Sequence, residues 1–178
     1  MLSNMRQVLS AALVVGMSGA VLAADRDPAR AENNMANCAD GIAGAAVLLS
    51  VEGLKDKDGN VRAQIYGSDP DEFLEKGAKL VRVDVPVTGE AQQLCVPLPA
   101  AGRYALVVLH DRNANGKADF FSEGFGFSNN PKLSLAPPDA EEVMFEAKAG
   151  VTRMSVTLTY IFRGDEEQKE KRRQLRRR

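Results

Sequence analysis

From Cys38 onward, hydrophobic and polar residues alternate with a period of two along most of the chain. This alternation is typical of β-strands that bury one face. It predicts seven strands, at residues 45–51, 61–65, 81–85, 94–98, 103–110, 141–148 and 154–162. The last strand is the clearest, and its predicted inward residues are Met154, Val156, Leu158, Tyr160 and Phe162.

Seven short strands separated by turn residues predict an all-β fold, an antiparallel β-sandwich of immunoglobulin-like or transthyretin-like type. The stretch "LPAAGRYALVVLH" supports this, because a tyrosine at a strand start suits a tyrosine corner, and Tyr104 is the candidate. One segment, "SDPDEFLEKG", breaks the alternation. Its capping signals, with Asp69 before Pro70 and Glu72, predict one short helix near residues 70–76.

The N-terminus has the features of a secretory signal peptide over residues 1–23, with an early arginine, an apolar stretch and small residues before Ala24. An uncleaved N-terminal anchor is the alternative. We therefore expect an exported protein, periplasmic or extracellular, without a transmembrane helix in the mature chain. The length of 178 residues suits one domain. We expect a flexible lead-in over 24–37, a β-sandwich over 38–162 and a disordered basic tail over 163–178.

Export changes the interpretation of the two cysteines, Cys38 and Cys95. In an oxidising compartment they are expected to form a disulfide, and a single pairing is possible. Two buried free thiols remain the alternative.

Charge is distributed unevenly along the chain. Residues 24–162 carry 14 basic and 20 acidic side chains, whereas residues 163–178 carry eight basic and four acidic ones. The basic tail suits an anionic membrane surface, or it is a solvated disordered segment. Export argues against nucleic acid as a partner.

The stretch "HDRNANGKADFFSEGFGFSNN", residues 110–130, holds most of the candidate chemistry. Its spacing resembles a calcium loop, with Asp111, Asn113, Asn115, the carbonyl of Lys117 and Asp119 as ligands. The glutamate expected at the twelfth position is absent, although Glu123 follows one place later. The alternative is a metal-free turn, since Asp, Asn and Gly also cluster in Asx-turns. Calcium is the candidate cofactor, in a weak site.

Four phenylalanines follow, and together with His110 they form the candidate binding surface: Phe120, Phe121, Phe125 and Phe127. Exposed together, they would mark a partner surface. Alternatively, they fold back and plug the end of the sandwich.

His110, the only histidine, is expected to be a structural hydrogen-bonding residue. No nucleophile elbow accompanies it. The sequence therefore predicts no enzyme, and no catalytic residue is assigned. A hydrolase that uses His110 with Asp111 or Glu123 is the alternative.

The block "GRYALVVLHDRNANGKADFFSEGFGFSNN" resembles a family of exported bacterial proteins known as domain-of-unknown-function family 2141. The resemblance extends from about Cys38 to Phe162. It departs after Asp119, where similar proteins carry a longer passage with a proline. The resemblance implies an exported β-sandwich without an established reaction. Together with the residues, it favours a non-enzymatic binding or accessory module of the bacterial envelope, with a purely structural domain as another alternative.

Overall fold

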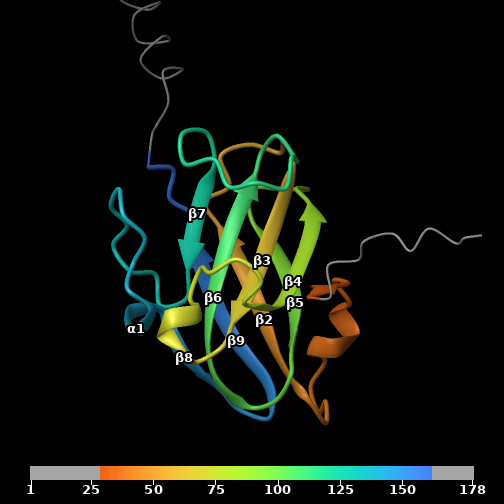
Figure 1. Ribbon diagram of the computed structural model, residues 1–178. Helices are drawn as coiled ribbons and strands as arrows, with labels where there is room; N and C mark the ends of the chain where they lie inside the picture. The colour runs from red at the N-terminus through yellow and green to blue at the C-terminus, as the bar shows by residue number, and fades with distance from the viewer. Residues whose placement is uncertain (1–28, 162–178) are drawn as a thin grey trace, which may run out of the picture.

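The computed structural model describes residues 29–161 as two β-sheets packed face to face (Figure 1). The predicted signal peptide and basic tail, with Phe162, lie outside the described residues, so export and membrane binding by the tail stay predictions. No helix in residues 29–161 has the length and apolar character needed to cross a membrane.

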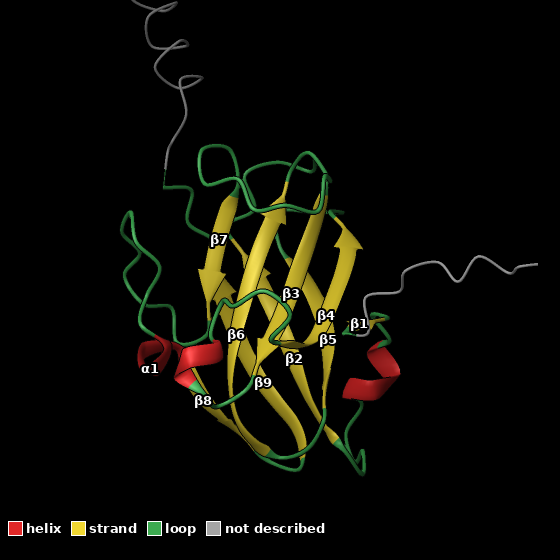
Figure 2. Cartoon of the chain, in the orientation of Figure 1, coloured by secondary structure: helices red, strands yellow, loops and turns green. Residues whose placement is uncertain are grey.

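The larger sheet has the strand order β1-β4-β3-β6-β7, and β8 pairs with the same edge of β6 as β7. Its strands are β1 (Arg30–Ala31), β3 (Asn60–Tyr66), β4 (Lys79–Pro86), β6 (Gly102–Asp111), β7 (Gly124–Phe127) and β8 (Met144–Ala147). The smaller sheet has the order β5-β2-β9. Its strands are β2 (Ala45–Glu52), β5 (Gln92–Leu98) and β9 (Gly150–Thr157). Figure 2 shows that strands and loops make up almost all of the described chain.

The predicted sandwich is confirmed, with two departures from purely antiparallel pairing. β2 pairs with β9 in parallel, and the short β1 pairs with β4 in parallel. Alternation predicts which face of a strand is buried but carries no information on the direction of its neighbour. The sequence pattern therefore fits both arrangements equally well.

The main core lies between the sheets, where the alternating residues meet as expected. Its fully buried side chains include Val47, Leu49, Val51, Val61, Ile65, Val83, Leu94, Val96, Leu106, Val108 and Val156. The predicted tyrosine corner is present, because the Tyr104 hydroxyl donates to the Ala100 carbonyl at 3.0 Å.

The predicted helix near residues 70–76 is much shorter in the structure. Only Pro70–Glu72 forms a 3₁₀ turn, η2, which the Asp69 side chain caps by accepting from the Asp71 N–H at 3.0 Å. The turn stops because Phe73 is extended and Leu74 has a φ of 65°. The Phe73 ring packs edge-on against Tyr66 and Phe127, so tertiary packing overrides the helical signal.

A second difference concerns residues 141–148, which were predicted as one strand. Their first half belongs to a short helix, α1 (Ala140–Val143), and only β8 is a strand. The Glu142 side chain accepts from the Asp139 N–H at 3.2 Å, which stabilises the first turn.

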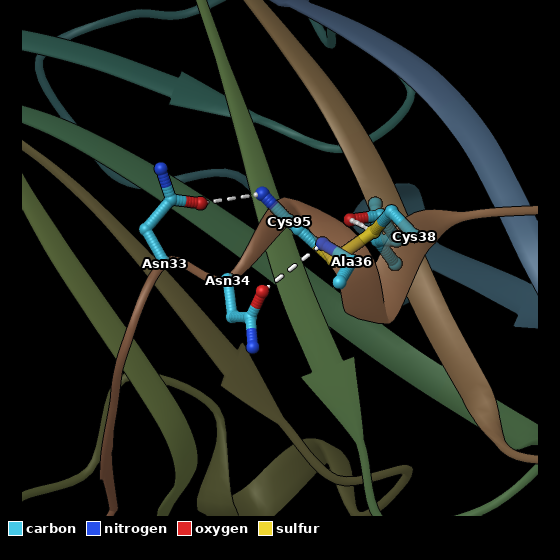
Figure 3. Close-up of a disulfide and its surroundings, with 6 residues drawn as sticks. Asn33, Asn34, Ala36, Cys38 and Cys95 are labelled. Carbon is cyan, nitrogen blue, oxygen red and sulfur yellow. Dashed lines mark hydrogen bonds between the residues drawn. A yellow bond between two sulfur atoms is a disulfide. The ribbon is translucent and has the colours of Figure 1, made fainter.

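In the expected lead-in, the described residues 29–37 make defined contacts, some of them beside the disulfide. Cys38 ends the 3₁₀ turn η1 (Met35–Cys38) and is bonded to Cys95 on β5 (Figure 3). The Asn33 side chain accepts from the Cys95 N–H at 2.8 Å. These contacts fasten residues 33–38 to the outer face of the smaller sheet.

Candidate functional site

The loop from Asp111 to Asp119 is built from side chains that accept hydrogen bonds from the loop's own backbone. The Asp111 carboxylate accepts from the N–H groups of Asn115 and Gly116, at 3.1 and 2.9 Å. The Asn113 side chain accepts from the Asn115 N–H at 2.9 Å, and the Asn115 side chain from the Lys117 N–H at 2.7 Å. The contacts of Asn113 and Asn115, each with the N–H group two residues ahead, are Asx-turns.

Arg62 of β3 reaches into this loop and was not predicted from the sequence. Its guanidinium donates to Asp84 at 2.7 Å, to Asp111 at 2.9 Å and to the Gly116 carbonyl at 3.1 Å. The three charged side chains are almost fully buried, at 5%, 8% and 1% exposure. Arg82 donates to Asp84 as well. The network therefore ties β3, β4 and the loop together.

The same network lowers the pKa of Asp84. Burial alone would raise this pKa, but the hydrogen bonds from Arg82 and Arg62 outweigh burial and hold it below its ordinary value. The carboxylate is thus ionised in the folded protein.

Calcium binding at this loop stays a hypothesis, and the contacts that its candidate ligands already make compete with it. The arginine already occupies one side of the Asp111 carboxylate, and Asp119 accepts from the Phe121 N–H and the Ser122 hydroxyl, at 3.0 and 2.9 Å. Within the described residues, no group of three or more His, Cys, Asp or Glu side chains converges as a metal site.

Glu123, a possible sixth ligand, is buried beside this loop at 1% exposure. One carboxylate oxygen accepts from the Asp119 N–H at 2.8 Å, and the other has no hydrogen-bond partner among the described residues. Burial raises the pKa of Glu123, and the nearby carboxylates of Asp111 and Asp119 raise it further. Ionised Glu123 is therefore costly in the folded state.

His110 is fully buried and hydrogen-bonded through both ring nitrogens. Nε2 donates to the Asp58 carbonyl at 2.7 Å, and Nδ1 is hydrogen-bonded to the Tyr160 hydroxyl at 2.6 Å. The Tyr160 hydroxyl in turn accepts from the Lys55 N–H at 3.0 Å. Both ring nitrogens of His110 are therefore engaged by neighbouring groups. His110 does not line the pocket described below.

The four phenylalanines do not form one common surface. Phe125 and Phe127 are buried in β7, and Phe120 stacks on Phe125 with ring centroids 4.6 Å apart. Phe120 is 43% exposed, whereas Phe121 is 71% exposed and does not line the pocket described below. Three of the rings thus cover the outer face of the larger sheet, not the end of the sandwich.

Glycines in β7 allow this strand to pass close to the C-terminal part of the chain. A Cβ on Gly124 would lie 2.6 Å from the Tyr160 ring, and one on Gly126 would lie 2.5 Å from a Val156 methyl. The sequence "GFGF" therefore places the two phenylalanine rings on one face of β7 and leaves the other face without side chains.

The side chains of the next three residues, the "SNN" stretch at 128–130, form hydrogen bonds with backbone groups of β6, α1, β8 and β9. The Ser128 hydroxyl donates to the Val143 carbonyl and accepts from the Leu106 N–H. The Asn129 amide donates to carbonyls at the α1–β8 junction. The Asn130 side chain pairs with the edge of β9, accepting from the Thr157 N–H at 2.8 Å and donating to the Ser155 carbonyl at 2.9 Å.

The outer face of the larger sheet carries a second hydrophobic cluster, separate from the main core. Beside it is a pocket of about 330 Å³, close to the lower end of the range for small-molecule sites. Its apolar walls are formed by Tyr66, Val107, Leu109, Phe120, Phe125 and Phe127. The β3–β4 segment, which crosses in front of β6 in Figure 1, contributes Leu74, and the segment before α1 contributes Ala136.

The sequence predicted only the phenylalanines of this pocket. Gln64, Tyr66 and Lys79 also line it, and they were missed. Their alternate positions on β3 and β4 mark an outward face, but no sequence signal shows that loops will cover that face.

A model of a bacterial family, described as uncharacterized protein conserved in bacteria (DUF2141), matches residues 49–155. No curated protein matches the chain. Among solved structures, the chain is similar to a candidate adhesin from Bacteroides ovatus, at 15% identity and a TM-score of 0.29. That similarity covers 65% of this chain and 44% of the other, so the chain spans less than half of that protein.

Proposed function

The chain belongs to the bacterial family DUF2141, whose description names no activity, and we propose that it is an exported, non-enzymatic binding module that holds a small apolar ligand on the outer face of its larger sheet. The pocket beside the stacked rings of Phe120 and Phe125 carries this proposal. Sites for small molecules are commonly concave, mostly apolar and supplied with a few polar groups.

The pocket combines a firm floor with an open rim. Val107, Phe125 and Phe127 are buried on β6 and β7, and paired strands hold them in place. At the rim, Leu74 is 38% exposed and Phe120 is 43% exposed. Large apolar side chains that stay exposed beside a cavity favour a binding surface. A ligand would bury these two side chains further without unfolding the floor.

The surroundings of His110 support a non-enzymatic role. A general base must reach a substrate proton, but both His110 nitrogens are engaged and the ring is fully buried. The neighbouring Asp111 is bound to Arg62. The hydrolase hypothesis would require both residues to leave these partners.

Export to the periplasm or the cell exterior is part of the proposal. It is supported by the signal-peptide features of residues 1–23 and by the Cys38–Cys95 disulfide, which suits an oxidising compartment.

The test is a fluorescence titration with Nile red, a neutral apolar dye. We expect saturable binding to the wild type, weakened roughly three- to tenfold by Phe120→Ala because the stacked wall of the pocket is lost. Phe121→Ala is the matched control, since this neighbouring ring lies outside the pocket. Equal binding by the wild type and both variants would show that the dye does not use the pocket and would contradict the proposal.

A further inference from the structure

We propose that the ligand is a small amphiphile with an apolar chain and a single carboxylate head, and that Lys79 binds the head. This inference rests on the proposed function, because it assigns the ligand class of the same pocket. It follows from the way the register of the larger sheet arranges polar and apolar side chains on its outer face.

The register places two rows of side chains across this face. One row runs through Asp84, Arg62, Leu109 and Phe125, and the next runs through Arg82, Gln64, Val107 and Phe127. In both rows the β4 and β3 positions are polar, and the β6 and β7 positions are apolar. The outer face of the sheet is therefore polar on its β4 and β3 side and apolar on its β6 and β7 side. The pocket takes Arg62 and Gln64 from the polar side and most of its apolar walls from the other, which suits a ligand of mixed character.

The charges at the pocket favour an anion. Among the described residues that line it, the charged ones are Arg62 and Lys79, both cationic. Arg62 is neutralised by Asp84 and Asp111. The Lys79 side chain is half-buried and has no hydrogen bond or ion pair with any described residue. A cation left without a partner beside an apolar cavity is stabilised by an anionic ligand group.

The position of Lys79 determines which end of the pocket would hold the head group of the ligand. In the register of the sheet it pairs with Tyr66, at the end of β3 remote from Arg62. The side chains of Arg62, Gln64 and Tyr66 follow one another along β3 over about 13 Å. A carboxylate at Lys79 thus leaves room for an extended chain that follows Val107 and Phe127 toward the stacked rings at the loop end.

Because the described residues at the pocket offer one free cation and few other polar groups, the head group of the ligand can carry few charges and hydroxyls. Ligands with several charges or many hydroxyls need several charge-assisted or neutral hydrogen bonds. Besides Lys79, the polar side chains at the pocket without a hydrogen bond to a described residue are those of Gln64 and Tyr66, because the Ser134 hydroxyl is bonded to Ala136. A single carboxylate matches this small set.

The experiment compares three probes with the same ten-carbon chain, decanoate, decanol and decyltrimethylammonium, by displacement of Nile red at neutral pH. We expect decanoate to bind the wild type about tenfold more tightly than decanol, and the cation to bind most weakly. Lys79→Glu should reverse the preference between the two charged probes. Lys76→Glu is the matched control, because it makes the same charge change on the β3–β4 segment outside the pocket.

Two outcomes would overturn the inference and leave the pocket proposal standing. They are equal binding of decanol and decanoate, and an unchanged preference in Lys79→Glu or, if that variant misfolds, in Lys79→Met. If dye binding appears only when residues 163–178 are deleted, the chain's own tail is the occupant and the inference falls. If none of the probes displaces the dye and Phe120→Ala does not affect dye binding, the proposed function fails as well.

Discussion

Replacing Arg62 with methionine should lower the free energy of unfolding by about 3 kcal/mol. Breaking a buried ion pair by removing one partner costs about 3–5 kcal/mol, because the other charge stays buried without compensation. Here Asp84 keeps its two hydrogen bonds from Arg82, at 2.6 and 3.2 Å, which reduces the cost on that side. Asp111 keeps only backbone N–H donors and is 1% exposed, so most of the loss arises there.

The loss should depend on pH with a definite sign. Because the arginines hold the pKa of Asp84 below its ordinary value, this carboxylate contributes stability above its unfolded-state pKa and loses that contribution as the pH falls through its folded-state pKa. Once Asp84 is protonated, its neutral carboxyl group is no longer stabilised by a neighbouring cation. The part of the difference between the wild type and Arg62→Met that arises at Asp84 should therefore shrink in acid.

Urea unfolding followed by circular dichroism measures this difference, provided that the slope with denaturant stays constant. Arg82→Gln is a control, with an expected loss of about 1 kcal/mol or less because Arg82 is more exposed. Adding Asp111→Asn to Arg62→Met should restore part of the lost stability. A loss below about 1 kcal/mol, or one that is constant from neutral to acidic pH, would refute the reasoning.

Three further predictions concern neighbouring features. Above neutral pH, Glu123→Gln should raise the Tm by about 2–4 °C. The reason is that burial raises the pKa of Glu123, so that its ionisation destabilises the fold. Thermal melts at several pH values should show that this gain vanishes in acid. Gly126→Ala should cost about 1–3 kcal/mol by overpacking against Val156, and Val156→Ala should relieve part of this in a double-mutant urea series. Millimolar calcium should leave the Tm unchanged, because Arg62 occupies the Asp111 carboxylate; a calcium-specific rise that Asp111→Ala abolishes would instead establish an ion loop.

Much of the fold could be predicted because single positions carry strong local information. Alternation identified the buried faces of β2, β3 and β9, and the only possible pairing of Cys38 with Cys95 identified the disulfide. The tyrosine corner at Tyr104 also has a local sequence signal. These features depend on period, position or chemistry within a short stretch.

The features that could not be predicted depend on which loops cover a given face of a sheet. The capping signals at Asp69 were correct, but the helix ended early because Phe73 joins the hydrophobic cluster of the outer face. Likewise, Arg62 occupies an outward position on an alternating strand, where an exposed charge is the normal expectation. Its burial follows from loops that arrive from elsewhere in the chain, and short-range patterns carry no information on them.

Two short motifs within the block that resembles the family, "HDRNANGKAD" at residues 110–119 and "GFSNN" at residues 126–130, have mainly structural contacts. In the first, His110 and Asp111 hold neighbouring loops. In the second, Asn130 satisfies the edge of β9. The residues that line the pocket lie largely outside these motifs. If the pocket binds a ligand as proposed, we expect ligand preference to differ among proteins that share the motifs, since Lys79 and Gln64 are not part of them.

The parallel pairing of β2 with β9 has a consequence for how the chain reaches its fold. Ala45 pairs with Gly150, so the partners are more than 100 residues apart in sequence. Such non-local pairing slows folding, because the chain must close a long loop before the contact forms. During synthesis, β2 and β5 can associate early, but the other edge of β2 stays open until β9 has emerged from the ribosome. A chain that stops before Gly150 would present this edge to other chains and would be prone to aggregate.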